Sequence, residues 1–236
     1  MIDFKNQRLL VIAPHSDDEV LGCGGLIHRI KAAGGKVYVL FLTLGTTRDY
    51  SPSGISTSQM RMQEIIKVMA YLKVDGFDIA FKGAKYHLKL DGIPNLELIN
   101  IIEKKSKVAI DRVRPNVITT SQLSDYNQDH RSANLATLAS TRPSPHDLKP
   151  FVPLVLSYEF SANAWAVSGL NTPNFFVSLD KDDLTAKIKA MQLYKSQSRA
   201  GFHTRSHETI ESLARLRGAQ TGSFAAEAYF CHRFYL

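Results

Sequence analysis

The chain has 236 residues, and its 29 Lys and Arg residues exceed its 22 Asp and Glu residues, which gives a formal net charge of +7. With 44% apolar and 22% charged residues, its composition is that of an ordered globular protein and argues against a disordered or fibrous chain. The basic residues are dispersed apart from Lys104–Lys107, so we predict no nucleic-acid partner, whereas an anionic small substrate stays open.

The first predicted elements form a βαβ unit. Apolar segments at Arg8–Ala13 and Val37–Thr43 have the composition of buried strands. Between them, residues 20–33 show the apolar spacing of a helix, and Gly34 and Gly35 give the expected signal for its end.

The same alternation continues along the chain. It predicts helices near 58–71, 96–110, 181–196 and 207–217, and strands near 77–81, 117–120, 153–158 and 174–178. Such alternation indicates an α/β fold in which helices cover both faces of a mainly parallel sheet, with ligands outside the carboxyl ends of the strands. We find no repeat and no domain boundary, and therefore predict a single domain over residues 1–236.

Polar residues gather where the first predicted strand ends. Pro14 terminates that strand, so His15, Asp17 and Asp18 should occupy the turn before the helix, where this architecture places ligand sites. His15 and Asp18 are three residues apart, so a ring nitrogen and a carboxylate oxygen can converge on one cation while Asp17 points elsewhere. Taken alone, the two aspartates would be better explained as residues of a helix N-terminus, which favours acidic side chains.

A second cluster, Ser124–Arg131, follows the predicted strand 117–120. Its His130 offers a third ligand, and two nitrogens with one oxygen leave a fourth position open for water, as in a catalytic zinc site. Iron(II) or another divalent metal also suits two histidines and a carboxylate. These residues therefore predict one divalent metal per chain without fixing its identity.

Longer segments resemble a known family. Val11–Gly25, which reads VIAPHSDDEVLGCGG, resembles the signature of the LmbE-like/PIG-L family of zinc-dependent N-acetylglucosaminyl deacetylases, and Asn127–His130 resembles its second motif. The similarity extends to Arg61–Glu64, Tyr194–Gln197 and Leu216–Glu227, and so covers nearly the whole chain. It implies a Rossmann-like, three-layer αβα sandwich and a hydrolase that removes the N-acetyl group from an amino sugar or an amino-sugar conjugate.

Carried over by motif position, the resemblance implies Zn²⁺ held by His15, Asp18 and His130. It also implies two catalytic carboxylates, with Asp17 as the general base that acts on water and Asp129 as the group that orients a histidine. The chemistry fits, because a divalent metal lowers the pKa of bound water from about 15.7 to roughly 7 and polarises the amide carbonyl. Asp17 then accepts a proton that it can return to the departing amine.

Two positions depart from the family pattern. Many relatives have Pro where this chain has Ser16, a change expected to alter the stiffness of the turn rather than the chemistry. Many also have a second His where this chain has Asn127. An Asn side chain can donate a hydrogen bond to an oxyanion but cannot act as a general acid. The sequence therefore leaves two choices for the general acid, Asp17 or another group.

Three residues are predicted to bind the substrate, namely Arg61, Arg48 and Asn127. A guanidinium group suits sugar hydroxyls or a phosphate, although a surface ion pair is the simpler explanation for either arginine alone. Arg48 lies in the polar loop Thr46–Thr57, where a functional role and surface variability are about equally expected. Tyr126 fits a pocket wall and a packing role equally well.

Two other functions compete with deacetylation. Gly22-Cys-Gly-Gly25 has the first two spacings of the dinucleotide-binding pattern G-x-G-x-x-G, but Ile27 stands at its third position and acidic residues precede it, so an oxidoreductase ranks low. The main alternative is a sugar- or nucleotide-binding protein that holds a metal without hydrolysing amides. Asp17 argues against it, because a merely structural site has little use for an unliganded carboxylate.

The remaining observations concern location and assembly. No apolar run approaches the roughly 18 residues of a membrane-spanning helix, and no signal peptide is visible. Cys23 and Cys231 form no CxxC pair, so a cytoplasmic location fits. Whether copies of the chain form a homo-oligomer stays open. We expect packing or exposure, and no functional role, for His28, His87, His146, His203, His207 and His232.

Overall fold

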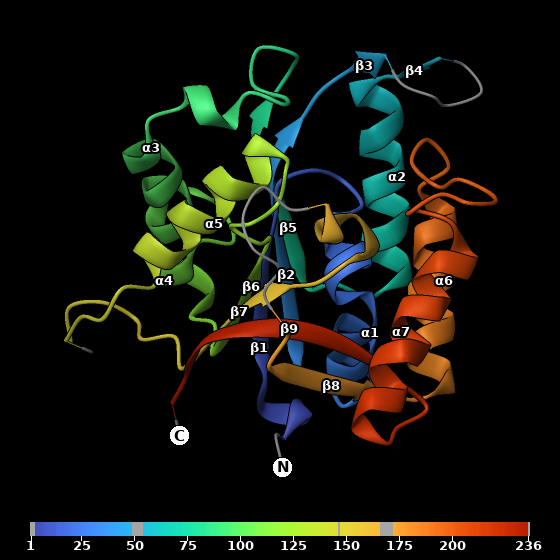
Figure 1. The fold of residues 1–236 in the computed structure, drawn as a ribbon. Coiled ribbons are helices and arrows are strands. Elements are labelled where there is room, and N and C mark those ends of the chain that lie inside the picture. The colour runs from blue at the N-terminus through green and yellow to red at the C-terminus, as the bar shows by residue number, and fades with distance from the viewer. Residues whose placement is uncertain (1–2, 49–53, 146, 166–171, 236) are drawn as a thin grey trace.

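A computed structural model describes residues 3–48, 54–145, 147–165 and 172–235. A seven-stranded sheet in the order β5-β2-β1-β6-β7-β9-β8 forms its centre, and helices lie against both faces of the sheet (Figure 1). The predicted α/β fold with three layers is therefore confirmed. Residues 49–53 of the polar loop and His146 lie outside the described residues.

The sheet is mainly parallel, as predicted. β1 runs parallel to β2 and β6, β2 to β5, and β6 to β7, whereas β9 pairs antiparallel with both β7 and β8. The strands of this sheet are β1 Arg8–Ala13, β2 Lys36–Leu44, β5 Gly76–Lys82, β6 Val117–Thr120, β7 Leu154–Tyr158, β8 Phe175–Leu179 and β9 Ala225–Phe234, and a separate two-stranded pair consists of β3 Thr47–Arg48 and β4 Ile55–Ser56.

Seven helices cover the sheet in the described part of the chain. They form two groups, whose buried side chains belong to separate hydrophobic clusters, and Figure 1 shows helices on both faces of the sheet. The first group is α1 Asp18–Ala32, α2 Ser58–Tyr71, α6 Lys181–Leu193 and α7 His207–Thr221, and the second is α3 Asn95–Asn100, α4 Ile110–Val113 and α5 Gln128–Ser140.

The central strand β1 explains why both faces need covering. Leu9 and Val11 belong to the hydrophobic cluster beneath α1, α2, α6 and α7, and Leu10 and Ile12 belong to the cluster beneath α3, α4 and α5. All four side chains are fully buried. A strand that is apolar on both faces is stable only between two helical layers.

The helix predicted over 96–110 is interrupted. α3 continues into a π-helical turn over Ile101–Lys105, and the chain is extended at Ser106 before α4 begins. The Asp78 carboxylate of β5 accepts hydrogen bonds from Ser106 Oγ at 2.9 Å and from the Lys107 backbone N–H at 2.8 Å. A side chain that binds this backbone locally competes with the helical hydrogen bonds, and apolar spacing gives no sign of it.

The first helix is tied to the end of the chain. Glu227 of β9 accepts hydrogen bonds of 2.8 Å from the backbone N–H groups of Gly25 and Leu26 in the middle of α1. Lys187 of α6 pairs with the same carboxylate at 2.6 Å and donates to the carbonyl of Leu21 at 2.8 Å. These buried polar groups satisfy one another, which joins α1, α6 and β9.

The glycines of α1 allow close packing. A Cβ atom on Gly22 would lie 2.4 Å from the ring of Tyr158 in β7, and one on Gly25 would lie 2.5 Å from Leu179 in β8. The Gly-rich segment that resembled a dinucleotide-binding pattern therefore serves the packing of α1 against the sheet.

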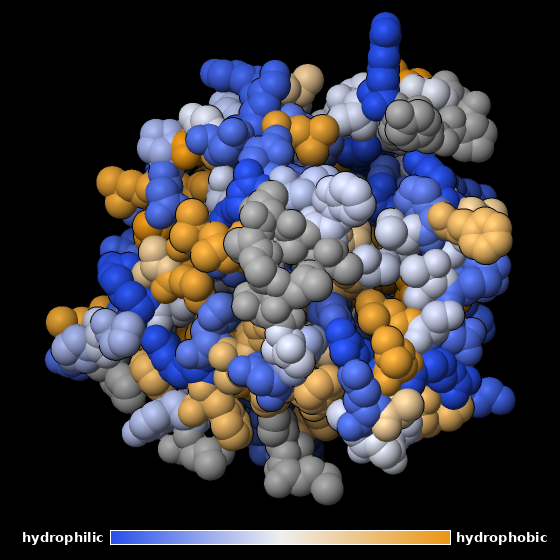
Figure 2. Space-filling view, viewed as in Figure 1, coloured by the Kyte–Doolittle hydropathy of each residue, from blue (hydrophilic) through white to orange (hydrophobic). Residues whose placement is uncertain are grey.

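The surface of the molecule is mixed. Hydrophilic residues separate several small hydrophobic areas on the face shown in Figure 2. Within the described residues, no helix combines the length and the apolar character needed to cross a bilayer.

Candidate metal centre

The two predicted ligand clusters meet at one edge of the sheet. His15 and Asp18 follow β1, and His130 lies in the first turn of α5, after β6. Since β1 and β6 are adjacent and parallel, their carboxyl ends lie side by side, and this brings the clusters together. The ligand atoms of His15, Asp18 and His130 all lie within 4.8 Å of one another, and all three residues are buried.

These three atoms form a nearly equilateral triangle. His15 Nδ1 lies 3.4 Å from Asp18 Oδ2 and 3.3 Å from His130 Nε2, and His130 Nε2 lies 3.3 Å from Asp18 Oδ2. Ligand atoms at zinc bond lengths of about 2.0–2.1 Å in a tetrahedron are about 3.3–3.4 Å apart. The donor set and its spacing therefore fit a divalent metal with three protein ligands.

Each histidine is oriented by a carboxylate on its other ring nitrogen. His15 Nε2 lies 3.0 Å from Asp129 Oδ2, and His130 Nδ1 lies 2.8 Å from Asp125 Oδ2. With a proton on each of these nitrogens, the lone pairs of His15 Nδ1 and His130 Nε2 face the centre, as in carboxylate–histidine–metal arrangements. Asp129, for which the resemblance implied an orienting role, thus lies within hydrogen-bond distance of the His15 ring.

Asp125 is a residue that the sequence reasoning missed. It stands five positions before His130 in the polar cluster after β6, but nothing in the pattern distinguishes it from its acidic neighbour. Its second oxygen accepts a hydrogen bond from the backbone N–H of Asn127 at 2.9 Å. The local backbone turn thus holds the Asp125 carboxylate in place, and this carboxylate orients the His130 ring.

The electrostatics of the centre favour a positive charge. Burial alone would lower the pKa of His130, but the carboxylates of Asp18 and Asp125 raise it to about 10. Burial likewise opposes ionisation of Asp18, yet the charge and hydrogen bonds of His130 and His15 hold the pKa of Asp18 well below its usual range. A cation between these groups is stabilised by the same carboxylates.

Asp17 occupies the N-cap position of α1, but its side chain makes no capping hydrogen bond. Its backbone has φ 98°, a left-handed conformation that is rare for a residue other than glycine. Its N–H donates to Glu19 Oε2 at 3.1 Å, and Glu19 Oε1 accepts a 2.5 Å hydrogen bond from the Tyr194 hydroxyl. Strain of this kind at a buried polar turn is typical of functional sites.

The Asp17 carboxylate is buried and only partly satisfied. Arg205 Nε lies 3.1 Å from its Oδ2, but without hydrogen-bond geometry, so this oxygen has an ion pair and no hydrogen bond within the described residues. Burial raises the pKa of Asp17 to about 6, although the charge of Arg205 opposes the shift. Such a carboxylate is ionised at neutral pH and binds a proton more readily than an ordinary aspartate.

A pocket of about 200 Å³ opens at this edge of the sheet. Its wall contains His15, one of the three candidate metal ligands, together with Asp17 and three arginines from separate elements. The described residues that line it are His15, Ser16, Asp17, Thr47, Arg48, Arg61, His87, Leu88, Asn127, Gln197 and Arg205. Arg48, Arg61 and Asn127, which were predicted to bind substrate, are thus brought together, whereas Tyr126 is half-exposed and lies outside the lining.

Arg61 is held by His87, for which no role was expected. Arg61 Nη1 lies 2.6 Å from His87 Nε2, and Nη2 donates to Thr47 Oγ1 at 2.7 Å. His87 Nδ1 lies 3.1 Å from Thr43 Oγ1, whose own proton goes to the carbonyl of Pro14 at 3.0 Å. Nδ1 of His87 therefore carries the proton and Nε2 accepts from Arg61. Burial, helped by the charges of His15 and Arg61, lowers the pKa of His87 to about 3.

Asn127 has a structural function besides its place in the wall. It is the N-cap of α5, and its Oδ1 accepts the backbone N–H of Asp129 at 2.9 Å. Capping uses the amide oxygen, so the NH₂ group is the part that can donate to a ligand. As expected for an amide side chain, Asn127 has no acidic proton to donate.

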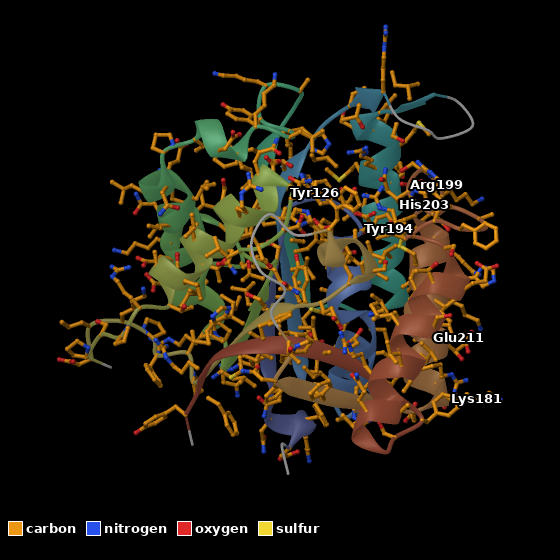
Figure 3. All side chains as sticks on the ribbon, viewed as in Figure 1. Tyr126, Lys181, Tyr194, Arg199, His203 and Glu211 are labelled. Atoms are coloured by element: carbon orange, nitrogen blue, oxygen red, sulfur yellow. The ribbon has the colours of Figure 1, made fainter. Side chains whose placement is uncertain are left out.

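Two segments that carried the resemblance contact each other. Glu64 of α2 accepts hydrogen bonds from the backbone N–H of Ser196 at 2.8 Å and from Ser196 Oγ at 2.6 Å. Gln197, the next residue, accepts from Arg205 at 3.2 Å. The connection between α6 and α7 is thus fastened to α2. Figure 3 labels Tyr194, Arg199 and His203 along this connection, across from Tyr126 near the start of α5.

The chain is similar to known proteins over most of its length. The chain is 27% identical to a protein of Escherichia coli (strain K12) described as the uncharacterized deacetylase YaiS, over 193 residues that cover 81% of this chain and 92% of that protein. The crystal structure of the conserved protein TT1542 from Thermus thermophilus superposes with a TM-score of 0.74 at 25% identity, covering 98% of this chain and 96% of that one.

Two more distant structures share the fold. The N,N'-diacetylchitobiose deacetylase of Pyrococcus horikoshii has a TM-score of 0.69 at 19% identity, with 98% of this chain and 86% of that chain covered. The 4-carboxy-2-hydroxymuconate hydratase GalB of Pseudomonas putida KT2440 has the same TM-score of 0.69 at 19% identity, with 98% of both chains covered. At this identity the likeness shows the fold alone, and the fold serves more than one reaction.

The family is decided by the match to residues 10–141, which make up more than half of the chain and contain both ligand clusters. That stretch fits the family model described as PIG-L, GlcNAc-PI de-N-acetylase. The chain therefore belongs to the PIG-L (LmbE-like) family of de-N-acetylases.

Proposed function

We propose that this protein is a metal-dependent hydrolase that removes the N-acetyl group from an amino sugar or an amino-sugar conjugate, with zinc as the metal. The observation that carries the proposal is the triangle of His15 Nδ1, Asp18 Oδ2 and His130 Nε2, with edges of 3.3–3.4 Å, beside the buried carboxylate of Asp17. A divalent metal bound by these residues would lower the pKa of water and polarise the acetyl carbonyl.

Asp17 is the proposed general base. Its Oδ2 has no hydrogen bond within the described residues and therefore has a lone pair available for a proton of the attacking water. Its pKa of about 6, raised by burial, lets it take up that proton and return it to the departing amine. Asp129 and Asp125 keep His15 and His130 in the orientation that the metal needs.

The general acid comes from Asp17 in this proposal, because the neighbouring candidates lack a suitable proton. Asn127 is an amide. His87 donates its Nδ1 proton to Thr43 and accepts from Arg61 at Nε2, so neither nitrogen has a proton for the amine. The NH₂ group of Asn127 is left to hydrogen-bond the oxyanion of the tetrahedral intermediate.

A metal-holding protein without amidase activity is the competing function. It needs the three ligands but has no use for a strained, buried carboxylate at Asp17, whose φ of 98° costs conformational energy. Both functions predict metal binding, and they differ in turnover. We place the protein in the cytoplasm on the basis of its free cysteines, Cys23 and Cys231.

The test combines metal analysis with acetate release. Purified protein loaded with one equivalent of Zn²⁺ should release acetate from members of a panel of N-acetylated amino sugars. Asp17→Asn should retain the metal and lose about 10²–10⁴-fold in kcat, the range for a general base, whereas His130→Ala should lose the metal itself. The matched control is Asp91→Asn, which removes an exposed carboxylate outside the pocket.

The outcomes separate the competing functions. Stoichiometric zinc with no acetate from any sugar, together with unchanged turnover of a surrogate amide in Asp17→Asn, would leave only the metal-holding protein. The panel should also include an unsaturated polycarboxylic acid monitored for hydration, since hydration is the reaction in the name of GalB. Hydration without acetate release would replace the deacetylase proposal.

A further inference from the structure

The connection between α6 and α7 brings two residues to the pocket, Gln197 and Arg205. Gln197 belongs to the segment Tyr194–Gln197, which resembles the family, yet it is neither a candidate metal ligand nor the proposed base. Its side chain is 5% exposed, so its amide needs partners within the protein. These partners lead on one side to α2 and on the other side to Asp17.

Glu64 of α2 holds the residue that precedes Gln197. Its buried carboxylate accepts hydrogen bonds from the backbone N–H of Ser196 at 2.8 Å and from Ser196 Oγ at 2.6 Å. Hydrogen bonds to a carboxylate are stronger than those between neutral groups. Because both carboxylate oxygens bind the same residue, the backbone and the hydroxyl of Ser196 are fixed together.

The hydroxyl of Ser196 sets the direction of the Gln197 amide. A hydroxyl has one proton, and that of Ser196 goes to Glu64, so Ser196 Oγ accepts a hydrogen bond from Gln197 Nε2 at 3.1 Å. Gln197 Oε1 is therefore the atom that faces Arg205, and it accepts a hydrogen bond from Arg205 Nη1 at 3.2 Å. Each donor in this series thus finds an acceptor, from Arg205 back to Glu64.

The backbone around Arg205 is held as well. The N–H of Arg205 donates to His203 Nδ1 at 3.0 Å, and its carbonyl accepts from the N–H of Arg199 at 3.4 Å; Figure 3 labels both partners. The next residue, Ser206, is the N-cap of α7, and its Oγ accepts the N–H of Thr209 at 3.2 Å. The guanidinium of Arg205 is therefore attached to a loop that is closed at its base.

Arg205 connects this series of contacts to the proposed base. Its Nε lies 3.1 Å from Asp17 Oδ2, in an ion pair without a hydrogen bond. A guanidinium is planar and rigid, so the contact of Gln197 with Nη1 also restricts the position of Nε. The positive charge attracts Asp17 Oδ2 and limits the rotation of the carboxylate, while the lone pair of this oxygen stays available for a proton.

We propose that Gln197 is a positioning residue, which holds Arg205 so that the Asp17 carboxylate faces the reacting water. Glu64 anchors Gln197 through Ser196 and so ties this position to α2. A displacement of about 1 Å in a catalytic group can cost about 10²-fold in rate, which makes the orientation of Asp17 important for kcat. The inference rests on the proposed deacetylation and adds a residue that acts on it through Arg205.

The first experiment measures acetate release by zinc-loaded variants. Gln197→Met keeps the length of the side chain and removes both hydrogen bonds of the amide. It should lower kcat at least about tenfold and change KM by less than about twofold, as expected when the transition state rather than substrate binding is affected. Arg205→Met should have a similar effect, and Arg205→Lys, which keeps the positive charge, should restore part of kcat.

The double variant decides whether Gln197 acts through Arg205. If it does, Gln197→Met should lower kcat by less than about twofold in the Arg205→Met background, because residues that act through one contact are not additive. Losses in kcat that multiply would overturn the proposal. A rise in KM with an unchanged kcat would also overturn it, since Gln197 would then bind the substrate directly.

The matched control is Gln220→Met. Gln220 of α7 also accepts a hydrogen bond from an arginine, Arg217 Nη1 at 2.7 Å, but it is exposed and lies outside the pocket. This variant should keep the kcat and KM of the parent protein. Circular dichroism and the zinc content of each variant verify folding. A loss of kcat in Gln220→Met as large as that in Gln197→Met would overturn the proposal.

Urea unfolding keeps this inference separate from the proposed reaction. Gln197→Met should increase the unfolding constant at least about threefold more in the parent protein than in Arg205→Met. If the parent protein releases no acetate, the deacetylase is refuted, and this coupling alone supports or overturns the hold of Gln197 on Arg205. Acetate release by the parent protein with additive effects on kcat and on unfolding would support the deacetylase and overturn the positioning role.

Discussion

Tyr194 donates a 2.5 Å hydrogen bond to Glu19, although the two residues stand 175 positions apart in the chain. Both side chains are fully buried. Glu19 in turn accepts the backbone N–H of Asp17, so the hydroxyl at the end of α6 supports the strained residue that we propose as the general base.

Removal of this hydroxyl should therefore affect both stability and rate. Tyr194→Phe leaves a buried carboxylate oxygen of Glu19 without its donor, which should lower the free energy of unfolding by about 1–3 kcal/mol. It should also lower kcat more than it raises KM, because Asp17 is less well held. Urea unfolding and acetate release measure the two effects. Tyr71→Phe removes a hydroxyl from a partly exposed residue of α2 and should change neither.

The orienting carboxylate of His130 gives a second prediction. Asp125→Asn keeps the shape of the side chain but removes the charge that lies 2.8 Å from His130 Nδ1. Zinc affinity, measured by competition with a chromogenic chelator, should fall about 10–100-fold. Asp111→Asn, at an exposed position of α4, is the control. An unaltered zinc affinity in Asp125→Asn would show that the ring is positioned by packing alone.

The glycines of α1 give a third prediction, on stability. In Gly22→Ala the new methyl group would meet the ring of Tyr158 at 2.4 Å. Overpacking of this kind should cost about 1–3 kcal/mol in the free energy of unfolding. Gly92→Ala adds a methyl group with no atom within 4 Å and should be nearly neutral. Thermal and urea unfolding compare the two, and equal stability would mean that α1 can move away from β7 at little cost.

Asp75 provides a prediction on pH dependence. Burial alone would raise the pKa of Asp75, but hydrogen bonds from Lys31, the Val37 N–H and Lys36 lower it below its usual value. A carboxylate with a lowered pKa stabilises the fold above its unfolded pKa and loses this contribution as the pH falls through its folded pKa. These contacts are partly solvated, so we expect about 0.5–1 kcal/mol near neutral pH.

The measurement compares the parent protein with Asp75→Asn by urea unfolding between pH 6 and pH 3. The difference in the free energy of unfolding should be largest at pH 6 and should shrink below about pH 4, because Asp75 takes up a proton first in the unfolded chain and only at lower pH in the folded protein. Asp147→Asn, at an exposed position, should show no such trend. A difference that grows on acidification would contradict the sign of the lowered pKa.

Local patterns were sufficient for the elements with strong periodicity. The predicted helix over 58–71 matches α2, and the predicted strand over 117–120 matches β6. α5 was not predicted because it begins inside the polar ligand cluster, where charged residues interrupt the apolar spacing that indicates a helix. β9 was not predicted either, since its sequence AAEAYFCHRF mixes buried and exposed positions with a charged Glu227 that faces α1.

The candidate site divides in the same way. His15, Asp18 and His130 stand in motifs, and the adjacency of β1 and β6 places them together. His87 and Arg205 could not be found from the sequence, because neither has a neighbour along the chain that marks its role. His87 depends on Gly45, where a Cβ atom would lie 2.3 Å from the His87 side chain, and Arg205 depends on how the connection before α7 is fastened.

The contact of Glu227 with Gly25 and Leu26 bears on how the protein is made. During synthesis, α1 leaves the ribosome some 200 residues before the carboxylate that binds its backbone. Contacts between parts of the chain so far apart in sequence close late in folding. The nascent chain therefore contains His15 and Asp18, the proposed metal ligands, long before α1 is anchored, and we expect tight binding of the proposed zinc ion only after the last strand has joined the sheet.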